Sequence, residues 1–156
     1  MSSERNGTIK AYATLRIAGD QLVPEQVTQI LKIVPTTAYA KGEHYSGGPR
    51  SPDLIGRTGV WYFCTDGIVA GNRFSDHLEF VERLLHGRDG GIGPLRALQR
   101  LMRRAALHAV VSGFWQGSAG AKRPSIPRSM SATFKALPAD IETDFDLDEK
   151  PSRHAA

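Results

Sequence analysis

The chain has 156 residues, of which 40% are hydrophobic and 23% are charged, and these proportions are typical of a globular domain rather than a disordered chain. No apolar run approaches the roughly 20 residues that a membrane-spanning helix needs, and residues 1–7 lack a signal-peptide core, so we expect a cytoplasmic protein. The formal net charge of +4 permits an anionic partner, and the single cysteine, Cys64, excludes an intramolecular disulfide and a cysteine-based zinc site.

The first predicted element is a strand over residues 8–17, because apolar and polar side chains alternate there with a period of two. One face of this strand carries Ile9, Ala11, Ala13, Leu15 and Ile17, and the other carries Lys10, Tyr12, Thr14 and Arg16. We expect the first face to lie in the core and the second to face water.

A helix is expected to begin at Pro24, because a proline at the first helical position loses no hydrogen bond, and to end near Val34, ahead of Pro35. A short strand over residues 38–41 is predicted next. Residues 42–59 are rich in glycine, proline and charge, and they predict a long loop. The β-branched and aromatic run at residues 60–65 predicts a further strand.

Two consecutive helices are predicted in the following part of the chain. Ser75 is the expected N-cap of the first, which ends at Gly87, and Pro94 begins the second. A strand over residues 107–115, a loop over 118–127 and a short helix over 129–137 follow. Residues 141–147 alternate apolar side chains with acids, which predicts an edge strand whose charges discourage edge-to-edge aggregation.

This order of elements predicts one α+β domain over residues 8–148, flanked by flexible tails at 1–7 and 149–156. The first six major elements follow the order β-α-β-β-α-β. We therefore expect an antiparallel or mixed sheet with helices on one face, built on a ferredoxin-like (split β-α-β) core with an extra C-terminal helix and strand.

Several short motifs lie along this pattern. They are Leu15-Arg16-Ile17-Ala18-Gly19-Asp20, Val23-Pro24-Glu25-Gln26-Val27, Leu31-Lys32-Ile33-Val34-Pro35-Thr36, Lys41-Gly42, Gly59-Val60-Trp61 and Ser75-Asp76-His77-Leu78. With these motifs the sequence resembles the bacterial family catalogued as domain-of-unknown-function 4279, over nearly the whole chain. The resemblance supports the α+β fold and implies no activity and no catalytic residues.

No group of residues predicts catalysis or metal binding. The five histidines lack the HExxH spacing that places two imidazoles on one helix face. We interpret Asp76, His77 and Glu79 as surface residues at a helix start, and Cys64 as a small buried side chain. We therefore expect no enzyme activity, no cofactor and no metal site.

Aromatic side chains in two strands are candidates for a ligand pocket. Trp61, Tyr62 and Trp115 would line its wall, because small-molecule pockets are largely apolar with aromatic side chains. The alternative interpretation, which we favour, is that they pack in the core or on the surface of the sheet.

The uneven distribution of charge is the most informative feature of the sequence. Nine basic residues stand against one acid between Arg83 and Arg128, whereas the segment from Asp140 to Glu149 holds six acids and no base. The candidate partner-binding residues are Arg96, Arg100, Arg103, Arg104, Lys122 and Arg123. The first four share one helix face and would suit phosphates or an acidic protein. Alternatively, they form a solvated face that the acidic strand of the same chain partly neutralises.

These observations favour a non-enzymatic protein-binding module of an immunity-like, antitoxin-like or regulatory kind. A first alternative is a nucleic-acid-binding accessory protein that uses the basic helix face. A second is a small-molecule binding protein or enzyme with the pocket of Trp61, Tyr62 and Trp115. We expect a protein partner and no membrane association, and the exposed edge strand is compatible with a monomer or a homodimer.

Overall fold

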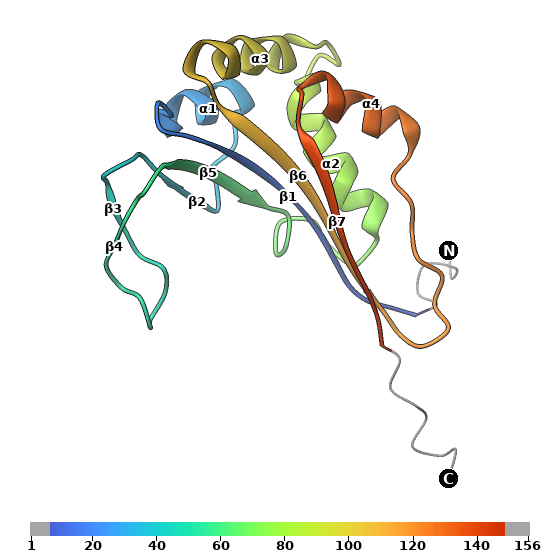
Figure 1. The fold of residues 1–156 in the computed structure, drawn as a ribbon. Coiled ribbons are helices and arrows are strands. Elements are labelled where there is room, and N and C mark those ends of the chain that lie inside the picture. Colours follow the sequence, from blue (N-terminus) through green and yellow to red (C-terminus); the bar gives the residue numbers. More distant parts are fainter. Residues whose placement is uncertain (1–6, 149–156) are drawn as a thin grey trace.

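The computed structural model describes residues 7–148 and shows a twisted sheet with helices on one face (Figure 1). The main sheet contains β1 (Thr8–Gly19), β2 (Thr37–Tyr39), β5 (Gly59–Cys64), β6 (His108–Gly117) and β7 (Asp140–Leu147). The helices are α1 (Pro24–Leu31), α2 (Phe74–His86), α3 (Gly93–Ala105) and α4 (Arg128–Ala136). Two short strands, β3 (His44–Tyr45) and β4 (Leu54–Ile55), pair with each other as a separate hairpin.

β1 lies at the centre of the main sheet, in which the strands follow the order β2-β5-β1-β6-β7. It is antiparallel to both β5 and β6, and β2 is antiparallel to β5. β7 runs parallel to β6 and forms an edge, so the sheet is mixed. β1 and β2, which α1 connects along the chain, are therefore separated in the sheet by β5.

The predicted alternation along β1 decides which face of the sheet carries the core. Ala11, Ala13, Leu15 and Ile17 are at most 1% exposed and pack beneath the helices. Burying a side chain of the size of Leu15 or Ile17 contributes about 1.5–3 kcal/mol, so this face holds the helices in place. Ile9 departs from the prediction, because the register shifts between Thr8 and Lys10 and leaves it 45% exposed.

The helices cover this face with their apolar sides. The side chains that α1, α2, α3 and α4 bury include Val27, Leu31, Leu78, Val81, Leu85, Leu95, Leu98, Leu101, Met130 and Phe134. Figure 1 shows all four helices on the same side of the sheet. The opposite face, which we call the open face, is left without a helix.

Residues 42–59 do not form the long loop that the sequence predicts. The β3–β4 hairpin lies within this stretch and is anchored by Tyr45, whose ring stacks on Tyr39 of β2 with ring centroids 3.8 Å apart. Gly56 packs closely against the backbone that follows β2, since a Cβ atom on residue 56 would lie 2.7 Å from the Ala40 carbonyl oxygen. The hairpin extends from the β2 side of the sheet, away from the helices (Figure 1).

Two helix boundaries also differ from the prediction. α1 ends at Leu31, because Lys32 takes a left-handed φ of 56° and its N–H bonds the carbonyl of Thr28. α2 begins at Phe74, one residue before the predicted cap Ser75, since Phe74 is only 5% exposed and packs into the core. Tertiary packing, rather than a capping side chain, sets the start of α2.

The structure confirms the α+β class and the mixed sheet with helices on one face. The ferredoxin-like assignment stays a prediction. The predicted tails at 1–7 and 149–156 lie outside the described residues, except for Gly7. Among residues 7–148, no helix has both the length and the apolar character needed to cross a membrane.

Candidate binding groove on the open sheet face

The open face carries side chains that the strand register aligns in three rows. The aromatic row contains Tyr12, Phe114 and Asp144. The middle row contains Cys64, Thr14, Ser112 and Glu142. The tyrosine–arginine row contains Tyr62, Arg16, Val110 and Asp140. Because neighbouring strands lie about 4.8 Å apart, side chains within one row are in contact range of each other.

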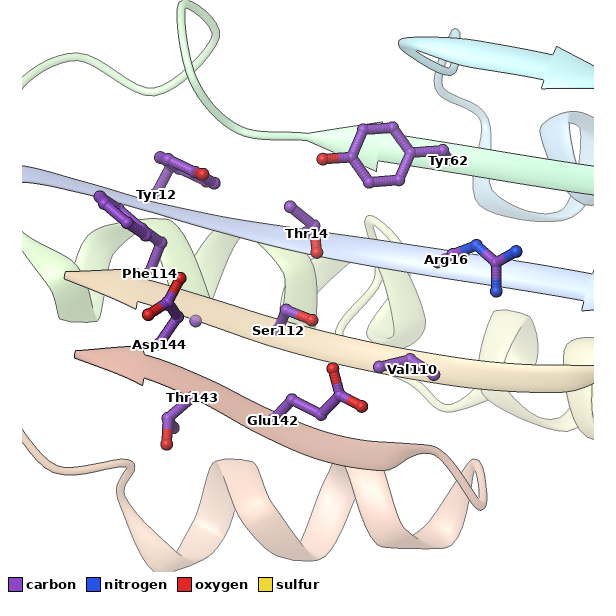
Figure 2. A pocket seen from close by; sticks show the side chains of 11 residues that line it. Tyr12, Thr14, Arg16, Tyr62, Val110, Ser112, Phe114, Glu142, Thr143 and Asp144 are labelled. Carbon is purple, nitrogen blue, oxygen red and sulfur yellow. The ribbon is translucent and has the colours of Figure 1, made fainter. Parts of the chain in front are cut away.

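Differences in side-chain size turn the middle row into a hollow. Thr14 and Ser112 are short, whereas long side chains stand in the rows on either side. The hollow has a volume of about 440 Å³, and we call it the cross-strand groove (Figure 2). Cys64, which we expected in the core, belongs to the middle row instead and is half-buried.

One wall of the groove is aromatic. The rings of Tyr12 and Phe114 stack with centroids 4.7 Å apart and an interplanar angle of 15°. Burial raises the pKa of Tyr12, and the nearby Cys64, Asp144 and Asp66 raise it further. The phenol is therefore neutral at physiological pH. This wall presents apolar ring surface and one neutral hydroxyl group.

The opposite wall combines a tyrosine and an arginine. Burial raises the pKa of Tyr62 to about 12, with further contributions from a hydrogen bond with Cys64 and from Tyr12. Figure 2 shows the Tyr62 hydroxyl directed along the strands, across the groove, toward the side of Tyr12, whereas the guanidinium of Arg16 points the other way along β1. The phenol of Tyr62 is thus a neutral hydrogen-bonding group, and Arg16 carries the positive charge on this wall.

The end of the groove at β7 is acidic. The side chains of β7 on the open face are Asp140, Glu142, Asp144 and Asp146. Asp140 is paired with His108, with its Oδ2 atom 2.9 Å from the His108 Nε2 atom. Within residues 7–148 no basic side chain is paired with Glu142 or Asp144, and both line the groove. This end therefore presents two carboxylates that form no ion pair with another described residue.

Comparison with protein-family models identifies the family of this chain. The model of the family described as "Domain of unknown function (DUF4279)" matches residues 9–148. The chain belongs to this family. No curated protein and no solved structure matches it. Since the match runs from β1 through β7, the cross-strand groove lies within the DUF4279 domain.

The pocket predicted from Trp61, Tyr62 and Trp115 is not assembled in the DUF4279 structure. Trp61 is 0% exposed and Trp115 is 2% exposed, and both lie on the helix-covered face of the sheet. Their indole N–H groups donate to the hydroxyls of Thr28 and Thr8, each at 3.1 Å. Tyr62 lies on the opposite face, because neighbouring residues of a strand point to opposite sides. The two tryptophans are core residues, and Tyr62 alone of the three lines the groove.

The six basic candidates fall into two separate groups. Arg96, Arg100, Arg103 and Arg104 are exposed on one side of α3, and we call them the arginine stripe. Lys122 and Arg123 lie in the segment between β6 and α4, at the far end of β6 (Figure 1). The ten residues of β6, at about 3.3 Å each, separate this segment from the end of α3. In the described part of the chain, no ion pair joins the arginine stripe to the acids of β7.

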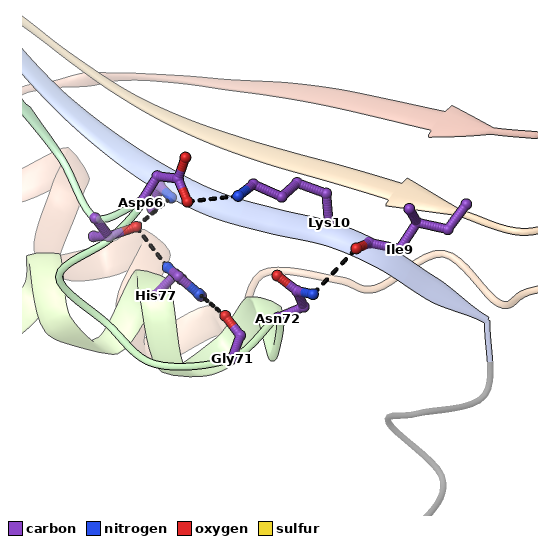
Figure 3. A network of polar contacts seen from close by, with 8 residues as sticks. Ile9, Lys10, Asp66, Gly71, Asn72 and His77 are labelled. Carbon is purple, nitrogen blue, oxygen red and sulfur yellow. Dashed lines mark hydrogen bonds and ion pairs between the residues drawn. The ribbon is translucent and has the colours of Figure 1, made fainter.

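His77, which we placed on the surface, is buried and fully hydrogen-bonded (Figure 3). Its Nε2 atom lies 2.8 Å from the Gly71 carbonyl oxygen, and its Nδ1 atom lies 2.6 Å from Thr65 Oγ1. Because a carbonyl can only accept, Nε2 carries the proton and Nδ1 accepts from the Thr65 hydroxyl. Thr65 Oγ1 in turn accepts the Ala13 N–H at 2.8 Å. These contacts give His77 a structural role in fixing the β5–α2 connection to β1.

No cluster of three histidine, cysteine, aspartate or glutamate side chains positioned for a metal ion occurs among residues 7–148.

The groove was not predicted from the sequence, because Tyr12, Thr14 and Arg16 were assigned to a water-facing side of their strand and the sequence pattern does not show which strands lie next to it. The sequence feature that indicates the groove is the presence of aromatic or acidic residues at outward positions of three predicted strands.

Proposed function

We propose that this DUF4279 chain is a non-enzymatic protein-binding module that holds an extended segment of a partner protein in the cross-strand groove. The observation that supports it is a groove with an aromatic wall on the sheet face that the helices leave open. From β5 to β7 the groove crosses three strand spacings, or about 14 Å, which accommodates roughly four residues of extended chain.

The shape and charge of the groove favour a protein segment over other ligands. A small-molecule site typically encloses most of the surface of its ligand, whereas this groove lies on an open sheet face. A nucleic acid would bring phosphates beside Glu142 and Asp144, and like charges repel. An extended polypeptide can bury apolar atoms on Tyr12 and Phe114 while its polar groups reach the hydroxyls of the middle row.

Capture from native lysate of the source cell, with nuclease and at moderate salt, tests the proposal when the groove is filled in one variant. Ser112→Trp places an indole on the floor of the groove, and Ala132→Trp adds the same group to the exposed side of α4. We expect the wild type and Ala132→Trp to retain the same partner at a stoichiometric ratio, and Ser112→Trp to lose it. Unchanged thermal unfolding would show that Ser112→Trp is folded. Equal retention by all three proteins, or no retained protein, would overturn the proposal.

A second candidate function is nucleic-acid binding by the arginine stripe. It is supported by four exposed guanidinium groups on one helix side that lack ion pairs within residues 7–148. Binding to a duplex DNA probe should then weaken with salt, with a slope in log K of about 0.9 per phosphate contacted. Replacing Arg96, Arg100 and Arg103 with alanine should reduce this slope, and replacing Lys122 and Arg123 should not. Affinity that is absent or independent of salt would remove this candidate.

The same triple alanine variant also decides which surface a captured protein uses. If the partner is lost from this variant and retained by Ser112→Trp, the arginine stripe is the docking site. The opposite result assigns the partner to the cross-strand groove.

A further inference from the structure

We infer that the partner segment carries an arginine side chain that enters the β7 end of the cross-strand groove and pairs with Glu142 and Asp144. This inference rests on the proposed function, and it specifies the chemistry of the segment that the groove binds. It follows from the charge, spacing and aromatic surroundings of these two carboxylates.

The charge on the open face selects a cationic group at this end. Lys10, the basic side chain nearest the aromatic row, is engaged by Asp66 at 2.6 Å, and Asp140 is engaged by His108. Glu142 and Asp144 have no such partner within residues 7–148. An acidic segment would meet two carboxylates here, whereas a basic side chain would neutralise them.

The strand spacing of Glu142 and Asp144 allows both side chains to reach one planar cation with several donors, once the exposed Glu142 carboxylate, which Figure 2 draws turned away from Asp144, rotates toward it. Glu142 and Asp144 are two positions apart on β7 and point to the same face, so their Cα atoms lie about 6.7 Å apart. A guanidinium has five N–H donors in a fixed fork and can bond both carboxylates at once. A lysine ammonium is a compact point charge, so it would bond two separated carboxylates less well than a guanidinium would.

The aromatic row supplies the rest of the site. Phe114 pairs with Asp144 in the register and stacks on Tyr12, so the ring surface lies directly beside the carboxylate. A guanidinium stacks on aromatic rings, and the aliphatic stem of arginine packs on the same apolar surface. The hydroxyl groups of Thr14 and Ser112 on the floor are available to the backbone of the segment.

The test is a titration of the isotope-labelled protein, followed by NMR, with three synthetic heptapeptides in which serine alternates with a second residue. That residue is arginine in the first peptide, neutral citrulline in the second and glutamate in the third. We expect the arginine peptide to shift the amide signals of Ser112, Phe114 and Asp144, the citrulline peptide to bind at least tenfold more weakly, and the glutamate peptide not to bind.

Matched variants separate the site from general electrostatic attraction. The double variant Glu142→Gln/Asp144→Asn should bind the arginine peptide at least tenfold more weakly than the wild type. Glu25→Gln removes an acid from the exposed side of α1 and should leave the affinity unchanged. Equal weakening per charge removed in the two variants would show a non-specific charge effect and overturn the inference.

The outcomes also separate this inference from the proposed function. Arginine and citrulline peptides that bind the groove equally would overturn the arginine inference and leave the groove as a peptide site. Absence of any shift in the groove with all three peptides would overturn both. Groove signals that move with protein concentration alone would identify a second copy of the chain as the occupant and overturn the inference.

Discussion

Replacing Thr65 with valine tests whether the buried hydroxyl–imidazole chain holds the β5–α2 connection to the central strand. Thr65 is 0% exposed and His77 is 1% exposed. The Thr65 hydroxyl accepts the Ala13 N–H at 2.8 Å and donates to His77 Nδ1 at 2.6 Å. Valine has nearly the same shape as threonine without the hydroxyl, so it leaves both of these groups unpaired in the interior.

The expected cost follows from the number of groups left without a partner. A buried donor or acceptor without a hydrogen bond costs about 1–3 kcal/mol, and Thr65→Val creates two of them. We therefore expect the free energy of unfolding to fall by about 2–6 kcal/mol, which is large beside the ~5–15 kcal/mol of a typical domain. Thr65→Ser keeps the hydroxyl and removes one methyl group, so it should cost about 1 kcal/mol.

Urea unfolding followed by tryptophan fluorescence measures both variants against the wild type. Trp61 and Trp115 are buried on the helix-covered face, so their emission reports the loss of the core. We expect the midpoint of Thr65→Val to lie well below that of Thr65→Ser, at a similar slope. If the two variants unfold at the same urea concentration, the hydrogen-bond chain contributes nothing beyond packing, and the reasoning is refuted.

Three further predictions concern the groove and the backbone. The pKa of Tyr62 is raised to about 12 in the folded chain, against about 10 in the unfolded chain. The stability of the wild type should therefore fall relative to that of Tyr62→Phe between about pH 10 and pH 12. Parallel pH profiles of the urea midpoint for the two proteins would contradict this. Gly113→Ala should cost about 1–3 kcal/mol, since the new Cβ would lie 2.7 Å from the Phe74 ring; an unchanged midpoint would show that the ring moves freely. Lys32→Gly should gain about 1 kcal/mol, because a φ of 56° strains a side chain-bearing residue and not glycine; a loss of stability would argue against strain at this position.

The alternation and spacing of apolar residues were sufficient to predict most of the elements. The two faces of β1 follow from a period of two, and the buried leucines of α3 follow from helical spacing. The α+β class and the edge position of β7 were predicted correctly from the same patterns. These features depend on residues close together in the chain, which is why a local pattern is enough to determine them.

Contacts between distant segments of the chain explain why some sequence predictions differ from the structure. The β3–β4 hairpin has strands of two residues each, too short to show alternation, and it is held by the stacking of Tyr45 on Tyr39. His77 was assigned to the surface because it follows a predicted cap, yet its position is decided by Thr65 and the Gly71 carbonyl. Neither contact leaves a periodic signal in the sequence.

The cross-strand groove shows the same division. Sequence alternation established that Tyr12, Thr14 and Arg16 share one face of a strand, and that acids share one face of residues 141–147. β6 brings these two strand faces onto one face of the sheet, because it pairs with β1 on one side and with β7 on the other. Pairing between strands about 100 residues apart, as between Thr8 and Gly117, is set by the packing of the whole core. A period of two tells which residues point together, and only the folded sheet brings strands that are distant in the chain side by side to form a site.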